Sequence, residues 1–165
     1  QAHVLGPSHA PVGAPQEALL FASARADHVS RMIRPALERG EIVLCDRFVD
    51  SSVAYQGAGR GLGTEHVLEL NHWALQGLVP QLTVVLAVAP ATAESRRLHR
   101  GVAVDRMEAE DRAFHHAVNA AFLELAARSP ERYLVLDAAE PVEAITRAVA
   151  ARVAPLLPGT PGGAL

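Results

Sequence analysis

The residues best suited to chemistry follow a short apolar run in the first third of the chain. The run, IVLC at 42–45, is typical of a buried parallel strand, and it ends in Asp46 and Arg47. Ligands of open α/β sheets bind at the carboxyl ends of the strands. A carboxylate there can hold a metal-bound water, and a guanidinium can bind a phosphate through two parallel hydrogen bonds. An ion pair that only closes a loop is the structural alternative.

Hydrophobic periodicity predicts that this strand belongs to an α/β fold. Helices are expected over 16–39, 50–56, 65–77, 91–100 and 107–128, and a last helix from Glu140-Pro141. Strands are expected over 41–46, 82–88 and 133–136. Pro35 is expected to bend the first helix, and Gly40 to end it. The alternation predicts a parallel sheet flanked by helices on both faces.

Composition narrows the class of protein. The 165 residues suit one domain, and the formal net charge of −3 disfavours a nucleic-acid partner. No apolar run reaches membrane-spanning length, and no signal segment is visible, so no membrane partner is expected. The only cysteine, Cys45, allows no internal disulfide and suits a reducing cytoplasm. Its place in the predicted strand indicates a small buried hydrophobe, not a nucleophile.

Several other features have simpler structural explanations. The glycines at 57–63 do not give the spacing G-x-G-x-x-G and follow a helix, so they do not predict a dinucleotide site. His115 and His116 point about 100° apart on a helix and cannot easily share a metal. Trp73, at helical spacing among leucines, is expected in the core. All 15 cationic residues are arginine, so the sequence holds no phosphate-loop lysine.

A set of short motifs, in this order and spacing, resembles bacterial thymidylate kinase. The motifs are LFASAR at 20–25, DRF at 46–48, SSVAYQGAGRG at 51–61, DRME at 105–108 and FLELA at 122–126. The resemblance covers about 17–157 and implies a phosphate-loop kinase fold of the α/β class. It also implies the family's reaction, in which ATP with Mg²⁺ phosphorylates dTMP to dTDP for dTTP synthesis. Relatives form homodimers, so a homodimer is implied here.

The resemblance implies a dTMP site. Phe21 and Arg25 lie four residues apart on one helix face, where the ring would stack on thymine and the guanidinium would bond its O4. From spacing alone, the pair is a core ring beside a solvated arginine. The remaining implied dTMP contacts are the phosphate for Arg47, the base edge for Ser52, the deoxyribose for Tyr55, and Gln56 in the same motif.

The resemblance also implies a phosphoryl-transfer site. Asp46 would bind Mg²⁺ through water, and three arginines would close over ATP, namely Arg97, Arg100 and Arg106. Phosphoryl transfer depends chiefly on alignment and on positive charge around the moving group. A solvated helix, paired locally with Asp105 and Glu108, is the alternative for these arginines.

The sequence departs from the family near its beginning. The family's first strand, its phosphate loop of the form G-x-x-x-x-G-K-[ST] and its second strand are not found, and prolines interrupt residues 6–13. In the family's strand order, 2-3-1-4-5, the first strand is central. We therefore expect an irregular lead-in (1–15), a kinase domain incomplete at its N-terminus (16–157) and a disordered tail (158–165).

This departure leaves three hypotheses. The first is a thymidylate kinase whose present chain is inactive alone. The second is a non-catalytic dTMP-binding module, or a fragment that needs a partner to supply the phosphate loop. The third is another nucleoside monophosphate kinase, which Phe21, Arg25 and Tyr55 disfavour.

Overall fold

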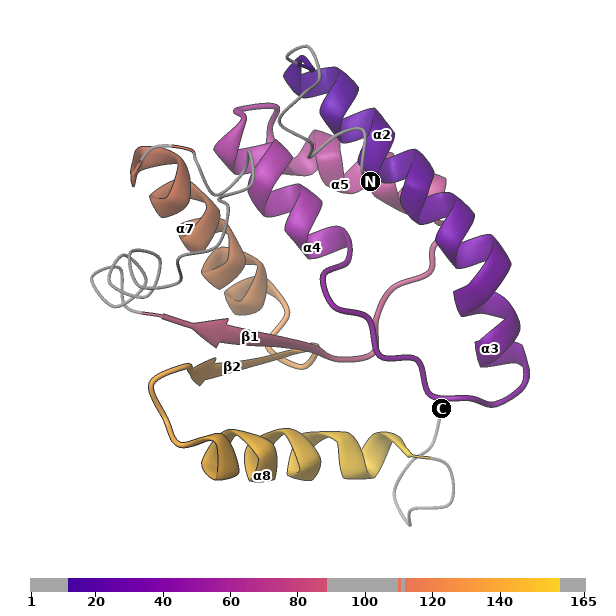
Figure 1. The fold of residues 1–165 in the computed structure, drawn as a ribbon, viewed down its shortest axis with the longest axis vertical. Coiled ribbons are helices and arrows are strands. Elements are labelled where there is room, and N and C mark those ends of the chain that lie inside the picture. The colour runs from indigo at the N-terminus through magenta and orange to yellow at the C-terminus, as the bar shows by residue number, and fades with distance from the viewer. Residues whose placement is uncertain (1–11, 89–109, 111, 158–165) are drawn as a thin grey trace, which may run out of the picture. The chain divides into compact units, whose positions relative to one another are not determined.

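The computed structural model describes residues 12–88, 110 and 112–157 (Figure 1). These residues divide into two compact units. The first unit lies within Gln1–Leu78 and Val102–Phe122, and the second within Val79–Gly101 and Leu123–Leu165. The predicted helix over 91–100, the tail at 158–165 and most of the lead-in lie outside the described residues. Within the described ranges, no helix has the length and apolar character needed to cross a bilayer.

The first unit opens with a long helical segment. It comprises α2 (Ala14–His28), a π-helical turn (Val29–Ile33) and α3 (Arg34–Glu38). The wider turn comes immediately before Pro35, whose ring and missing N–H disturb regular α-helical bonding. Gly40 follows the segment with φ +76°, a left-handed conformation that glycine adopts without strain. The predicted helix over 16–39 is therefore confirmed, with its irregularity just before Pro35.

Two further helical segments complete the part of this unit that precedes Leu78 in the sequence. α4 (Val49–Ser52) continues into a π-helical turn (Val53–Gly59, η2), and α5 (Thr64–Ala74) packs against both η2 and α2. A Cβ at Gly59 would lie 2.5 Å from the Phe114 ring, so this close approach requires glycine. Gly59 thus serves packing, and Gly61 and Gly63 turn the chain with positive φ angles.

The core of the first unit joins η2 to α7 (Arg112–Arg128). Ala54, Phe114, Val118 and Ala121 are buried together, and Tyr55 and Phe122 pack against them. The Tyr55 ring makes edge-to-face contacts with Phe114 and Phe122, at centroid distances of 5.9 and 6.5 Å. This packing fixes the position of the Tyr55 side chain.

The second unit is built on two parallel strands. β1 (Thr83–Ala87) pairs with β2 (Tyr133–Asp137) in the register Thr83↔Tyr133 to Ala87↔Asp137. Figure 1 shows the strands as neighbouring arrows of the same direction, and α8 (Val142–Val153) contacts β2. A short 3₁₀ turn (Ala154–Leu156) follows. The two predicted strands and the helix after Pro141 are confirmed, and with them the α/β class.

The predicted strand over 41–46 is wrong. The segment is irregular, and Leu44, expected to be buried, is 91% exposed. A strand forms only when a neighbour pairs with its N–H and C=O groups. Among the described residues, the sheet contains β1 and β2 alone, so this apolar run has no hydrogen-bonding neighbour.

Candidate nucleotide site

The guanidinium of Arg25 is the centre of one polar arrangement in the described part of the chain. Arg25 on α2 donates from Nη1 to Asn71 Oδ1 on α5 and from Nη2 to Ser52 Oγ on α4, the latter at 2.9 Å. Its Cζ also lies 5.7 Å from the centre of the Phe48 ring. Three helices and the turn before α4 therefore hold one planar cation.

Burial shapes the electrostatics of this cation. It lowers the pKa of the Arg25 guanidinium, while the charges of Cys45 and Asp50 oppose the shift. Arginine remains protonated under any physiological condition. A cation partly removed from water interacts more strongly with a ligand oxygen than an exposed cation does.

The Arg25 arrangement leaves donor capacity for a ligand. A guanidinium has five N–H donors, and Asn71 and Ser52 are the acceptors it meets among the described residues. Phe21 lies one helical turn earlier on α2 and is half-buried. A flat ring and a held cation are thus placed on one helix face, as the spacing predicted. Together they can receive a planar group that carries a carbonyl.

Arg47 and Tyr55 form a second pair. The Arg47 guanidinium lies 4.5 Å from the centre of the Tyr55 ring, and Arg47 is an exposed residue. Arg47 has φ +63°, a conformation that residues other than glycine seldom adopt and that clusters at functional sites. The two predicted residues are therefore brought together, with the cation open to an anionic ligand.

Gln56 belongs to a polar cluster of four residues, of which Glu17 and Gln56 are buried, and we call it the Glu17 cluster. Gln56 Nε2 donates to Glu17 Oε1 at 3.0 Å, and Arg60 Nε lies 3.4 Å from the same oxygen. Arg60 Nη1 also donates to Glu110 Oε1 at 2.6 Å. Although burial lowers the pKa of Arg60, the bond to Glu110 and the charge of Glu17 outweigh it and raise that pKa. The Nε2 group of Gln56 thus has its partner within the protein.

Asp46 does not lie at a strand end, because no strand forms there. Its side chain is exposed beside Arg47, and Cys45 is exposed too, contrary to its predicted burial. Within the described part of the chain, no three His, Cys, Asp or Glu residues gather as a metal site. Mg²⁺ is usually bound by one or two carboxylates together with substrate phosphates and water. One exposed carboxylate next to an exposed arginine is compatible with that pattern.

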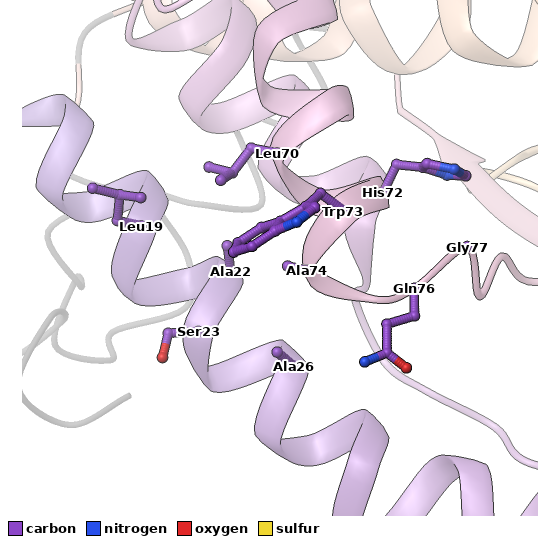
Figure 2. A pocket seen from close by; sticks show the side chains of 10 residues that line it. All are labelled: Leu19, Ala22, Ser23, Ala26, Leu70, His72, Trp73, Ala74, Gln76 and Gly77. Carbon is purple, nitrogen blue, oxygen red and sulfur yellow. The ribbon is translucent and has the colours of Figure 1, made fainter.

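Two further sequence predictions have different outcomes. Arg97, Arg100 and Arg106 lie outside the described residues. Trp73 is 78% exposed, so its predicted place in the core is wrong. Figure 2 shows its ring over a groove of about 830 Å³ between α2 and α5. The groove is lined by Leu19, Ala22, Ser23, Ala26, Leu70, His72, Trp73, Ala74, Gln76 and Gly77.

Comparison with known proteins places this sequence in a family. The family model described as thymidylate kinase matches residues 5–149. A thymidylate kinase of Leifsonia xyli subsp. xyli is 53% identical over 137 residues, 83% of this chain and 65% of that protein. Another, from Symbiobacterium thermophilum, is 44% identical over 155 residues, 94% of this chain and 72% of that protein. The chain belongs to the thymidylate kinase family.

Membership of the thymidylate kinase family confirms the resemblance drawn from the motifs. It also confirms the phosphate-loop kinase type of fold. The chain spans 65% of the length of the Leifsonia relative and 67% of a relative from Clavibacter michiganensis subsp. michiganensis. The individual residue assignments stay predictions.

In this member of the thymidylate kinase family, the sequence did not reveal two residues that hold predicted site residues, namely Glu17 and Asn71. Glu17 could have been found, because it precedes Phe21 and Arg25 by four and eight positions and shares their helix face. Asn71 gave no signal, because it lies 46 positions from Arg25 and the contact depends on how α5 packs against α2.

Proposed function

We propose that this chain binds dTMP as the phosphoryl acceptor of a thymidylate kinase reaction, in which ATP supplies the γ-phosphoryl group and dTDP is formed for dTTP synthesis. The observation that carries the proposal is the Arg25 guanidinium, held by Asn71 and Ser52 one turn from Phe21. Thymine O4 is an acceptor, so it suits a fixed donor. Family membership supports the same substrate.

Each predicted residue has a role in this proposal. Phe21 stacks on the base and Arg25 donates to O4, with Ser52 beside it. Tyr55 lies under the deoxyribose. Gln56, the next residue, supports Tyr55 through its bond within the Glu17 cluster. The Arg47 fork binds the dTMP phosphate, where two parallel hydrogen bonds fix the oxygen that attacks.

The transfer itself needs charge more than covalent chemistry. Bound Mg²⁺ would neutralise charge on the phosphates, and Asp46 would hold it through water. We assign Arg97, Arg100 and Arg106 to the ATP phosphates. In-line attack requires that the attacking oxygen of the dTMP phosphate and the γ-phosphoryl group of ATP be held in alignment.

A non-catalytic dTMP-binding module is the second candidate, and one observation favours it. The 165 residues include no lysine, so the phosphate-loop lysine that cradles the β- and γ-phosphates is not among them. On this hypothesis, a partner supplies the phosphate loop. The two candidates share the dTMP site and differ in whether this chain takes part in phosphoryl transfer.

One experiment tests the shared dTMP site and the expected lack of turnover. We expect calorimetric titration to show dTMP binding at least about tenfold tighter than dCMP, because cytosine presents an amino group where thymine presents O4. With ATP and Mg²⁺, we expect dTDP formation far below the usual kinase range of about 1–100 per second. Equal affinities would contradict the proposed substrate. Turnover within that range would contradict the module hypothesis.

We further propose a homodimer formed through the groove between α2 and α5. Trp73 and Leu19 expose large apolar surfaces there, which a second copy would cover (Figure 2). Trp73→Glu should weaken self-association by about 100-fold or more, since an uncompensated buried charge costs about 3–5 kcal/mol. Sedimentation velocity over a concentration series measures this. Val142→Glu, on an exposed residue of α8, is the control. A wild-type chain that sediments as a monomer throughout would contradict the proposal.

We place the protein in the cytoplasm. Its only cysteine carries an exposed thiol, which a reducing compartment preserves. The net charge of −3 gives no support for a nucleic-acid partner.

A further inference from the structure

Asn71 is a fully buried amide with both ends occupied. Its exposed fraction is 0%, and Nδ2 donates to Val67 O, one turn earlier on α5, at 2.7 Å. Because the NH₂ group must face that carbonyl, Oδ1 must face the other way. The orientation of the amide is therefore fixed by its own helix, and Oδ1 accepts the bond from Arg25 Nη1.

Two anchors fix the plane of the Arg25 guanidinium. Asn71 Oδ1 holds Nη1 and Ser52 Oγ holds Nη2, so rotation about the long side chain is restricted at both ends of the fork. The Ser52 hydroxyl can turn to suit a moving donor, whereas the Asn71 amide cannot. Asn71 is thus the rigid anchor of the pair.

We propose that Asn71 is a positioning residue that sets the preference for thymine over cytosine by fixing Arg25. The inference rests on the proposed function, because it assigns the base selectivity of that same site. A guanidinium held in one plane presents its remaining N–H groups at one place. At that place the O4 carbonyl of thymine accepts a hydrogen bond, whereas the amino group of cytosine faces a second donor. A mobile guanidinium turns away from the amino group and discriminates less.

Two substitutions separate positioning from support of the helix. Asn71→Asp keeps an acceptor for Arg25 but cannot donate to Val67 O. Asn71→Ser can still donate to the carbonyl four residues earlier, but its short side chain loses the acceptor for Arg25. If Asn71 served only α5, the serine variant would behave like wild type and the aspartate variant would not.

The measurement is the ratio of the dTMP and dCMP dissociation constants by calorimetry. We expect Asn71→Ser to lower the selectivity about tenfold, which is about 1.4 kcal/mol, and Asn71→Asp to retain it. In an Arg25→Ala chain, already unselective, Asn71→Ser should change the ratio no further. Selectivity kept in the serine variant, or lost in the aspartate variant alone, would overturn the proposal.

A second readout needs no nucleotide. Rotation about the Arg25 Cζ–Nη bonds, measured by ¹⁵N NMR, should be slow in wild type and in Asn71→Asp and faster in Asn71→Ser. Equal rotation in all three would overturn the positioning role. If rotation follows this order while wild type binds dTMP and dCMP alike, the selectivity claim is overturned together with the proposed function, and the anchoring of Arg25 stands.

Discussion

Arg47→Lys is expected to weaken dTMP binding by about 10- to 100-fold and to leave thymidine binding nearly unchanged. The Arg47 fork lies over the Tyr55 ring, and Arg47 is an exposed residue. An ammonium is a point charge and cannot give a phosphate two parallel hydrogen bonds. A hydrogen bond to a charged group is worth about 1.5–3 kcal/mol, from which this range follows. Titration with both ligands measures the effect.

The comparison of two ligands makes the result specific. Thymidine lacks the phosphate, so a loss shared by both ligands would show that Arg47 supports the structure instead. Arg31→Lys is the matched control, because Arg31 pairs with Asp27 on an exposed helix face and its substitution should affect neither ligand.

Arg60→Leu is expected to lower the free energy of unfolding by about 3 kcal/mol. Glu17 is 1% exposed, and Arg60 is a cation that reaches it in the Glu17 cluster. Removing one partner of a buried ion pair costs about 3–5 kcal/mol, because the remaining charge stays desolvated. The lower value applies because Gln56 still donates to the Glu17 carboxylate. Urea unfolding followed by circular dichroism measures the change.

Two further variants test the cause. Arg31→Leu removes an exposed arginine from an ion pair and should cost under about 1 kcal/mol. Glu17→Gln in the Arg60→Leu chain should recover part of the loss, because the amide carries no charge to desolvate. A double variant less stable than Arg60→Leu alone would show that packing, not charge, sets the cost.

Local structure was largely predictable from the sequence. The helices α2, α5 and α8 and the strands β1 and β2 follow from periodicity, proline and glycine, which act over a few neighbouring residues. The run at 42–45 shows the limit of such reasoning. Its apolar character predicts a strand, but pairing depends on a neighbour that residue types do not reveal.

The site was predictable where one helix carries it and not where helices meet. Phe21 and Arg25 share a face because helix geometry requires it. Asn71 joins them only through the packing of α5 against α2. Trp73 shows the converse, because helical spacing among leucines could not tell a buried face from the exposed wall of a groove.

The exposed thiol of Cys45 gives this chain a ready attachment point for a reporter. The sequence has one cysteine and no lysine, so a maleimide dye would react at one known side chain without any substitution. That side chain lies two residues before Arg47, in the turn assigned to the phosphate. Fluorescence from such a dye would record nucleotide arrival at this turn directly, in a protein that is otherwise unchanged.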